Sequence, residues 1–373
     1  MKICFYNVTA SYIFGGLETY CWEVGHALAE RGHEAVIFAG DRGAARSDKV
    51  RLNQFRFRPE KEWPDFGVRF RRLAERLSFA RNSLDALIAG SFDAVVVNKP
   101  FDFPILWQAR RHGLRAQTVF RSGGTDFFPT DRWFADAIDH WVSCSRYNAQ
   151  EITARYARPV TVLHNGVDAE RFRPVARQPE WRAARHISED ALLVASLGRL
   201  VGWKGLRTVI EALAGLEGDV QYLVIGEGPD EHALKTLAAE LGLGARVHFV
   251  GRVTREHLPQ LLSEADLLVQ PSIGVETFGI SVVEAMACAL PVFASNIGGL
   301  PEIIVDAESG RLLPPRDVAA WRNAIAAAAA DRATLRNWGA AGRMRAQREF
   351  SWARNAARLE EMLVAHQQLA VTR

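Results

Sequence analysis

The sequence lacks several patterns that would place the protein in a specialised class. Its 373 residues contain no apolar run near the roughly 20 residues that a membrane-spanning helix needs. Its four cysteines form no CxxC pair and no metal-ligand spacing, so we expect reduced thiols in the core. The formal net charge of +3 gives no support to nucleic acid as a partner. No signal-peptide pattern opens the chain, and we expect a cytoplasmic protein.

Motifs for a carboxylate-held metal and for a dinucleotide are also missing. No Asp-x-Asp triplet occurs, so the charge of any bound diphosphate has to be met by cations and backbone N–H groups. Gly226-Glu227-Gly228 follows a strand pattern, but Glu231 stands where the dinucleotide fingerprint needs its third glycine. We therefore expect no metal, no nicotinamide and no other resident cofactor.

The chain has the length and the apolar content for two domains. Hydrophobic residues make up 48% of the sequence, enough for two large cores. A strand, a glycine turn, a helix and a second strand fill residues 2–39, and the same alternation restarts at Ala191. This pattern predicts two doubly wound α/β domains that face a cleft. We place the first at 1–168, with a C-terminal helix at 351–373 that returns to it, and the second at 169–350.

The stretch from Gln270 to Leu300 carries the strongest chemical pattern. Glu276 and Glu284 are separated by seven residues, and an apolar helix, which we expect Thr277 to cap, carries the second. A helix that begins at a glycine offers free backbone N–H groups and the positive end of its dipole to a phosphate. The two carboxylates would lie on the order of 10 Å apart, about the reach from sugar to ribose in a nucleotide sugar. The alternative is an amphipathic helix with one solvated glutamate.

Two basic residues follow a strand pattern in the same domain. Arg199 precedes the glycine-bearing loop LVGWKG, and Lys204 lies in that loop. Basic residues in loops are usually solvated. Because they belong to the same predicted domain as the two glutamates, we favour a role for them in neutralising a diphosphate.

Several motifs resemble the C-terminal domain of family-4 glycosyltransferases: GRLVGWKG, the GEGP turn, FVGRV, and ETFGISVVEAMACALPVFAS with GGLPEII. FGGLETY and HNGVDAERFRP are similar to motifs of the same family. The resemblance covers nearly the whole chain, most strongly over residues 190–315 and least over 40–120. It implies the GT-B fold of two Rossmann-like lobes, and sugar transfer from a nucleotide donor with retention of configuration and without a bound metal.

The resemblance also implies a role for each matching residue. Glu276 would hold the sugar hydroxyls and Glu284 the ribose hydroxyls. Arg199 and Lys204 would neutralise the diphosphate. Backbone N–H groups would assist them from the segment that contains Phe278, Gly279, Ile280 and Ser281.

Two further loops complete the site that the resemblance implies. The loop with Arg252 and Val253 would lie along the base. Gly15 and Gly16, which by themselves indicate either a plain turn or room for a ligand, would let the first lobe close on the phosphates or the acceptor.

One departure concerns the first domain. Many relatives carry a histidine after the strand that ends here at Phe120, and that histidine contacts the donor sugar. This chain has Arg121, followed by a segment that contains Asp126. Either residue replaces the contact, or the sugar specificity differs.

The favoured function is a retaining glycosyltransferase that uses a UDP-sugar rather than GDP-mannose. It would transfer to a glycan or lipid-linked acceptor in cell-envelope polysaccharide synthesis. Attack would occur from the front face, with the leaving diphosphate accepting the proton of the acceptor. A nucleotide-sugar epimerase of the same fold and a catalytically silent binding homologue remain alternatives.

A basic stretch in the first domain suggests a second partner. Residues 42–81 contain 12 basic and 5 acidic residues. We expect Phe70, Leu73 and Leu77 to face the core, which leaves the arginines between them outward, namely Arg69, Arg72 and Arg76. The surface is either simply solvated or a peripheral contact with an anionic membrane at its inner face.

Overall fold

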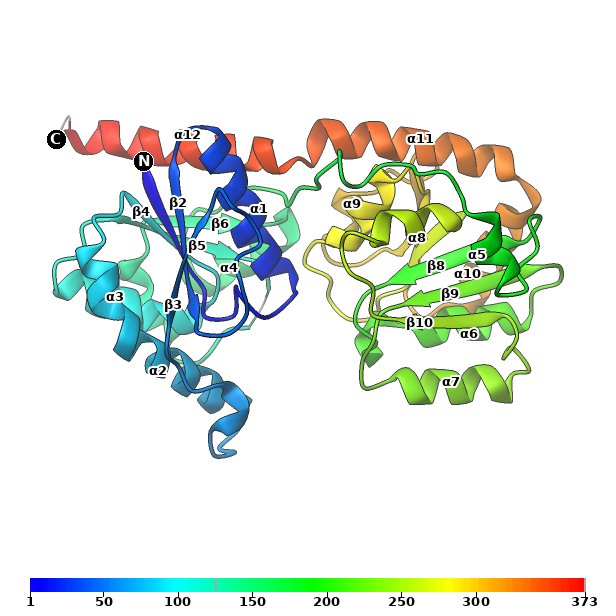
Figure 1. The fold of residues 1–373 in the computed structure, drawn as a ribbon, viewed down its shortest axis with the longest axis horizontal. Coiled ribbons are helices and arrows are strands. Elements are labelled where there is room, and N and C mark those ends of the chain that lie inside the picture. Colours follow the sequence, from blue (N-terminus) through cyan, green and yellow to red (C-terminus); the bar gives the residue numbers. More distant parts are fainter. Residues whose placement is uncertain (125, 372–373) are drawn as a thin grey trace. The chain divides into compact units, whose positions relative to one another are not determined.

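The computed structural model describes residues 1–124 and 126–371, and these form two compact units (Figure 1). The first unit contains Met1–Asn165 together with the C-terminal segment that begins at Trp352. The second contains Gly166–Ser351. Each unit is a parallel sheet with helices packed on it, which is the arrangement that the alternating strand and helix patterns predict.

The first unit is built on a seven-stranded sheet with the order β3-β2-β1-β4-β5-β6-β7. Its pairings are parallel, and the order reverses between β1 and β4. Strands β1 and β4 are apolar on both faces because helices cover both sides of the sheet. The strands are β1 (Lys2–Tyr6), β2 (Glu34–Gly40), β3 (Arg51–Phe55), β4 (Ala94–Val97), β5 (Gln117–Ser122), β6 (His140–Ser143) and β7 (Thr161–Val162).

The helices of the first unit include the last helix of the chain, α12. Its Asn355 donates hydrogen bonds to the carbonyls of Leu163 and His164, and its Glu360 pairs with Arg31, the residue that follows α1. The expected return of the C-terminal helix to the first lobe is therefore confirmed. The helices are α1 (Gly16–Glu30), α2 (Val68–Ala89), α3 (Phe103–Arg111), α4 (Arg146–Tyr156) and α12 (Trp352–Val371), with short 3-10 helices η1 (Glu60–Glu62), η2 (Pro100–Asp102) and η3 (Asp131–Ala137).

The second unit has a six-stranded parallel sheet with the order β10-β9-β8-β11-β12-β13. Its strands are β8 (Leu192–Leu197), β9 (Val220–Ile225), β10 (Val247–Gly251), β11 (Leu267–Gln270), β12 (Val292–Ser295) and β13 (Gly310–Leu313). Its helices are α5 (Pro179–Ala183), α6 (Leu206–Ala214), α7 (Glu231–Glu240), α8 (Leu258–Glu264), α9 (Ile280–Ala287), α10 (Val318–Ala330) and α11 (Arg332–Glu349), with 3-10 helices η4 (Gly202–Lys204) and η5 (Leu300–Glu302).

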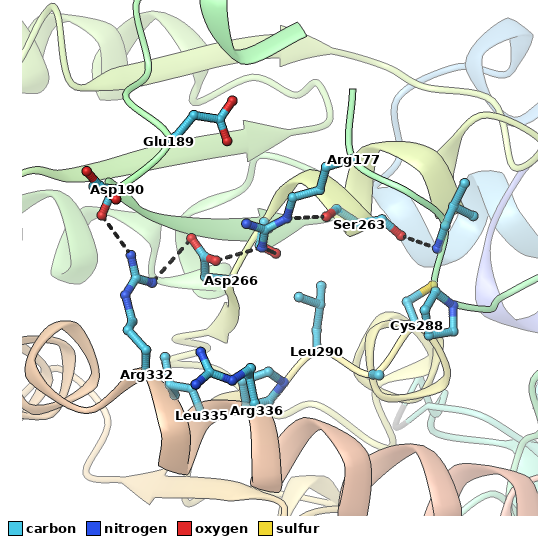
Figure 2. Close-up of a pocket in the computed structure, with 15 residues that line it drawn as sticks. Arg177, Glu189, Asp190, Ser263, Asp266, Cys288, Leu290, Arg332, Leu335 and Arg336 are labelled. Atoms are coloured by element: carbon cyan, nitrogen blue, oxygen red, sulfur yellow. Dashed lines mark hydrogen bonds and ion pairs between the residues drawn. The ribbon is translucent and has the colours of Figure 1, made fainter. Parts of the chain in front are cut away.

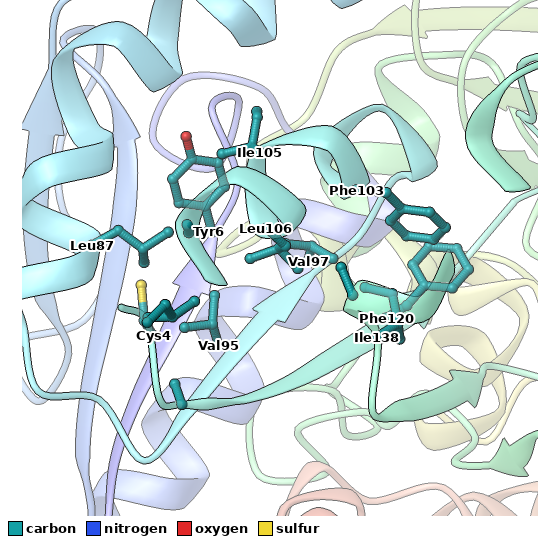
Figure 3. Close-up of a cluster of buried hydrophobic side chains, with 14 of the residues drawn as sticks. Cys4, Tyr6, Leu87, Val95, Val97, Phe103, Ile105, Leu106, Phe120 and Ile138 are labelled. Carbon is teal, nitrogen blue, oxygen red and sulfur yellow. The ribbon is translucent and has the colours of Figure 1, made fainter. Parts of the chain in front are cut away.

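Each unit has its own apolar core. In the first, side chains from β1, β4 and β5 interdigitate with those of α2 and α3 (Figure 3). Aromatic rings dominate one part of it, where Phe103 packs edge-on against Phe120 and Trp141. All four cysteines of the described chain are buried and free, as expected. None of the helices in residues 1–124 and 126–371 is both long enough and apolar enough to cross a bilayer.

The predicted apolar stripe of α2 is wrong. Phe70 and Leu77 are 42% and 48% exposed, while Phe79, further along the helix, is completely buried. The first turns of α2 extend past the strands of the sheet in Figure 1, so the apolar residues there have no sheet to cover. Arg76, expected on the surface, is instead 3% exposed and forms an ion pair with Asp102.

Candidate functional site

Helix α9 begins where the sequence places a phosphate-binding helix, but its cap differs from the expectation. The N-cap is Gly279, at φ 114°, and not Thr277. A Cβ at Gly279 would lie 2.9 Å from Leu300 Cδ2, in a conformation that residues other than glycine rarely adopt. The first N–H groups of this eight-residue helix have no side-chain cap. They remain a suitable group of donors for an anion.

Glu276 lies just before that helix and is held by a cation. Lys204 Nζ donates a hydrogen bond of 2.6 Å to Glu276 Oε2, and both side chains are mostly buried. Gln270 Nε2 and Ser272 Oγ donate to the same oxygen, at 3.2 and 3.4 Å. Oε1 receives no hydrogen bond from any residue that the structure describes. One carboxylate oxygen is therefore fixed, and the other remains open to a ligand hydroxyl.

The Lys204 loop and the Glu276 loop are joined through their backbones. The carbonyl of Trp203 accepts hydrogen bonds from the N–H groups of Ile273 and Gly274, at 2.8 and 3.0 Å. Gly205 follows at φ 69°, and a Cβ there would come within 2.0 Å of the Pro271 carbonyl oxygen. These contacts fix the position of Lys204 beside Glu276, although 72 residues separate them in sequence.

Arg199 lies at the carboxyl end of β8 and its side chain is exposed. It pairs with no acidic side chain in the described part of the chain. Arg252 follows β10 at the same edge of the sheet, 58% exposed, with a guanidinium nitrogen 3.9 Å from Glu227. Val253 comes next along this loop. The carboxyl edge of the sheet therefore presents solvent-exposed basic groups near the ends of β8 and β10.

The glycines of the GEG turn have a structural explanation. A Cβ at Gly226 would lie 2.0 Å from the Gly198 carbonyl oxygen, and one at Gly228 would lie 2.2 Å from that of Leu200. Both glycines therefore allow the turn after β9 to pack on the loop after β8. Close backbone packing accounts for this motif without a dinucleotide.

Glu284 is 6% exposed on α9 and has a partner that the sequence did not reveal. Arg255 Nη2 donates to Glu284 Oε1 at 2.5 Å, and the Arg255 guanidinium lies 5.5 Å from the centre of the Phe172 ring. No spacing rule links positions 255 and 284. Gln270 and Ser272, which hold Glu276, were also missed. The signal that could have identified them is their position at and just after the carboxyl end of β11, six and four residues before the glutamate.

The remaining predicted residues belong to the first unit. Gly15 is the N-cap of α1, and Gly16 is the first residue of that helix. A Cβ at Gly15 would approach Glu18 Oε2 to 2.5 Å. Glu18, which is 7% exposed, accepts a hydrogen bond from the Thr9 hydroxyl. The glycine therefore makes room for a buried carboxylate at the carboxyl end of β1.

Arg121 and Asp126 occupy different environments. Arg121 is 1% exposed, donates to Asn165 Oδ1, and has its guanidinium 4.0 Å from the centre of the Tyr20 ring. Asp126 is partly exposed and is paired with Arg72. Of the two candidates for the missing histidine contact, Asp126 is the one at the surface of its unit.

A separate cavity of about 540 Å³ lies at the amino edge of the second sheet (Figure 2). Asp266 is part of its lining, and its carboxylate forms ion pairs with the guanidinium groups of Arg177 at 2.6 Å and Arg332 at 3.3 Å. These two arginines help to lower the pKa of the Asp266 carboxyl, although burial alone would raise it. The cavity contains none of the predicted site residues. Within residues 1–124 and 126–371, no three His, Cys, Asp or Glu side chains are grouped to hold a metal ion.

Two family models match the sequence. The model described as glycosyl transferases group 1 matches residues 177–345. The model described as Glycosyltransferase Family 4 matches residues 14–171. Together they cover both units.

Curated relatives have related names. The chain is 32% identical over 276 residues to a GDP-mannose-dependent alpha-(1-6)-phosphatidylinositol monomannoside mannosyltransferase of Mycolicibacterium smegmatis, covering 68% of this chain and 72% of that protein. The enzyme with this name in Mycobacterium tuberculosis is 29% identical, with 94% of each chain covered. A D-inositol 3-phosphate glycosyltransferase of Mycobacterium avium is 39% identical, over 48% of this chain and 43% of the relative.

Solved structures share the fold. Sucrose-phosphate synthase from Thermosynechococcus elongatus matches with a TM-score of 0.85 and 25% identity, over the full length of both chains. HepE from Anabaena, in complex with UDP and glucose, matches with a TM-score of 0.81 and 21% identity, over 98% of this chain and 100% of HepE. The second match shows the fold alone. The expected architecture of two Rossmann-like units is confirmed.

Proposed function

The chain belongs to the family-4 glycosyltransferases, and from this premise we propose that it transfers a sugar with retention of configuration, without a bound metal, to a glycan or lipid-linked acceptor. The observation that carries the proposal is the Lys204–Glu276 pair of 2.6 Å, placed before the uncapped amino end of α9. This arrangement combines a cation, a fixed carboxylate and backbone N–H donors in the second unit. A sugar joined to a diphosphate presents the matching groups.

The diphosphate needs positive groups because it becomes the leaving group. Arg199, Lys204 and the first N–H groups of α9 are the candidates in the second unit. Negative charge grows on the departing phosphate oxygens as the bond from the anomeric carbon to the diphosphate breaks and the bond from that carbon to the acceptor oxygen forms. Donors fixed in advance therefore stabilise the transition state more than the ground state. The departing phosphate oxygen also accepts the proton of the attacking hydroxyl, so the step needs no separate base.

Glu276 suits orientation of the sugar better than nucleophilic attack. Its Oε2 is occupied by Lys204, Gln270 and Ser272, which lowers its nucleophilicity and fixes the carboxylate plane. Its Oε1 can then accept a hydroxyl of the donor sugar in one orientation. Glu284, held by Arg255, would bind the ribose in the same manner.

Two nucleotide-sugar donors, which differ in base and in sugar, have to be distinguished. The sequence interpretation favours a UDP-sugar, and that remains a prediction. The names of the mannosyltransferase relatives specify GDP-mannose, which makes this donor the main competitor.

A donor screen tests the proposal. Purified protein is incubated with GDP-mannose and with a set of UDP-sugars, with lipid-linked and glycan acceptors, and release of the nucleoside diphosphate is measured. We expect release with one donor that persists in excess EDTA, and a product of unchanged anomeric configuration by NMR. Activity that is lost with EDTA and restored by Mg²⁺ or Mn²⁺ would contradict metal independence. Isomerised donor without transfer would indicate an epimerase.

The two glutamates should separate in a binding experiment. Glu284→Ala is expected to weaken binding of the free nucleoside diphosphate by about 10- to 100-fold, because hydrogen bonds to a charged group are lost from the ribose. Glu276→Ala should leave that affinity within about threefold while lowering turnover, because its ligand is the sugar. Isothermal titration calorimetry measures the affinities. Glu231→Ala, which removes a carboxylate paired with Lys235 on α7, is the matched control. Equal losses in the two site variants would refute the assignment.

We also propose that the enzyme works at a membrane surface. The named acceptor of the mannosyltransferase relatives is a phosphatidylinositol derivative, which resides in a bilayer. A lipid-linked acceptor of this kind requires peripheral contact with the membrane that contains it.

A further inference from the structure

Large apolar side chains are exposed together at one end of the first unit. Phe66, Val68 and Phe70 are 75%, 45% and 42% exposed, and they lie in the first turn of α2 and in the loop before it. The rings of Phe66 and Phe70 contact each other edge to face, with centroids 5.3 Å apart. Figure 1 shows this end of α2 extending beyond the strands of its unit. We call these three residues the aromatic tip.

Solvent-exposed loop tips normally carry small or polar residues. Single exposed apolar residues are common, but a contiguous group is a sign of a binding surface. The aromatic tip is such a group, because its members are near neighbours in sequence and two of them touch. The surface itself therefore indicates a partner that is apolar at the point of contact.

The charges around the aromatic tip indicate the second property of that partner. Lys61 and Arg69 are exposed and have no ion-pair partner among the residues that the structure describes. Asp65, which precedes the aromatic tip, is 73% exposed and lies 3.6 Å from the Arg71 guanidinium. The first turn of α2 contains no acidic residue, although the positive end of a helix dipole favours acidic side chains. Residues 60–72 contain four basic and three acidic side chains, so a small net positive charge at this helix end is left to external anions. A phosphate-bearing surface would supply them.

We propose that the aromatic tip inserts into the interfacial layer of an anionic membrane, with Lys61 and Arg69 on the lipid headgroups. This inference deepens the proposed action on a lipid-linked acceptor and rests on it. Insertion of aromatic side chains beside basic residues is the pattern of interfacial membrane contacts. It differs from attachment by charge alone, because the apolar part should persist when salt screens the headgroups.

Sedimentation with vesicles tests the insertion. The full-length protein is mixed with vesicles of phosphatidylcholine alone or with phosphatidylglycerol added, at low and high salt. We expect tighter binding to the anionic vesicles, and we expect part of that binding to persist at high salt. Phe66→Ser combined with Phe70→Ser should lower the partition coefficient by about tenfold or more at both salt concentrations. Arg69→Glu should lower it by about fivefold or more, and mainly at low salt.

A matched control distinguishes the aromatic tip from exposed aromatics in general. Trp133 is 76% exposed on η3 of the same unit, so Trp133→Ser removes a comparable apolar surface elsewhere. We expect this variant to bind vesicles like the unsubstituted protein. Equal losses in both variants, or unchanged binding after the double Phe substitution, would overturn the proposal.

A fluorescent label reports insertion directly. The native cysteines are buried, and burial raises the pKa of Cys21 and Cys288 to about 12, so none should react with a thiol probe at neutral pH. Phe66→Cys can therefore be labelled selectively with an environment-sensitive nitrobenzoxadiazole dye. Anionic vesicles should shift its emission to the blue, and the same dye at Trp133→Cys should not shift. No shift at position 66 would contradict insertion.

The inference and the proposed function can fail separately. Hydrolysis of the nucleotide-sugar donor in solution needs no membrane, so the double Phe variant should retain the hydrolysis rate of the unsubstituted protein. Vesicle binding without turnover of any donor would support membrane insertion of the aromatic tip and refute the proposed sugar transfer. Turnover of a donor without vesicle binding would refute only the membrane insertion of the aromatic tip.

Discussion

Lys204→Ala is expected to lower kcat/KM for sugar transfer by about 10²- to 10³-fold, the usual loss when one fixed donor to a developing negative charge is removed. The Lys204 ammonium lies 2.6 Å from Glu276, in a loop held to the neighbouring strand end by backbone hydrogen bonds. Removal of the ammonium takes away both a cation for the leaving diphosphate and the group that fixes the Glu276 carboxylate. Initial rates over a range of donor concentrations measure the effect.

Arg207→Ala provides the control for Lys204→Ala. Arg207 lies three residues further on, is 68% exposed, and is paired with Glu211 along α6. It has the same charge and lies close in sequence, but it lies outside the predicted site. We expect its kcat/KM to stay within about twofold of the unsubstituted enzyme, because exposed pairs of this kind contribute little. A similar loss in both variants would point to general electrostatics, and no loss at Lys204 would refute its role.

The double variant of Lys204 and Glu276 should show strong coupling. Because one side chain positions the other, the two losses are not independent. We expect the double substitution to Ala to cost much less than the product of the two single losses. If the loss of kcat/KM in the double variant equals the product of the two single losses, the two side chains act independently and their ion pair of 2.6 Å does not contribute to catalysis.

Asp102→Ala is expected to lower the free energy of unfolding of the first unit by about 3–5 kcal/mol. Arg76 Nη1 donates to both Asp102 oxygens, at 2.6 and 2.7 Å, and both side chains are almost fully buried. Removal of the carboxylate leaves a guanidinium in an apolar interior without its counter-ion. Hydrogen exchange in β1 and β4 measures the free energy of opening in this unit.

Asp136→Ala is the matched control for Asp102→Ala. Asp136 also pairs with an arginine, Arg158, but its side chain is 87% exposed. We expect a change of less than about 1 kcal/mol. Replacement of the buried pair together, by Arg76→Met with Asp102→Leu, should recover most of the loss, because no unpaired charge remains. If Asp102→Ala and Asp136→Ala lower the free energy of unfolding equally, the buried pair stabilises the unit no more than an exposed pair does.

Local patterns predicted the elements of the site well. Helix α9, the glycine before it and the strands on either side follow from short-range propensity and from apolar periodicity. The cap was predicted at Thr277 and lies at Gly279, because the backbone there has φ 114°, which side-chain-bearing residues rarely adopt, and a Cβ would also crowd Leu300 of η5. Element identity is a local property, while the exact helix end depends on a tertiary neighbour.

The stripe on α2 illustrates the same limit. Its apolar spacing is correct for an amphipathic helix, yet Phe70 and Leu77 are exposed and Arg76 is buried. Periodicity indicates that a helix has an apolar face, but it does not indicate how far a supporting sheet extends along it. The strands end before the helix does, and the burial of Arg76 depends on Asp102 in another element.

The sequence alone determined the two-unit α/β architecture, the family, and the position of Arg199, Lys204 and Glu276 near the carboxyl edge of the second sheet, because these depend on motifs and on strand order along the chain. The tertiary structure alone decided which side chains touch at that edge, and it added residues that the sequence had not indicated, such as Arg255. The ion pair of Lys204 with Glu276 joins positions 72 residues apart, and that of Arg255 with Glu284 joins positions 29 apart. Such pairs arise because parallel strands bring loops from distant parts of the chain to one edge. Side-chain contacts at that edge depend on backbone packing, such as that of Gly205 on Pro271, which no spacing in the sequence encodes.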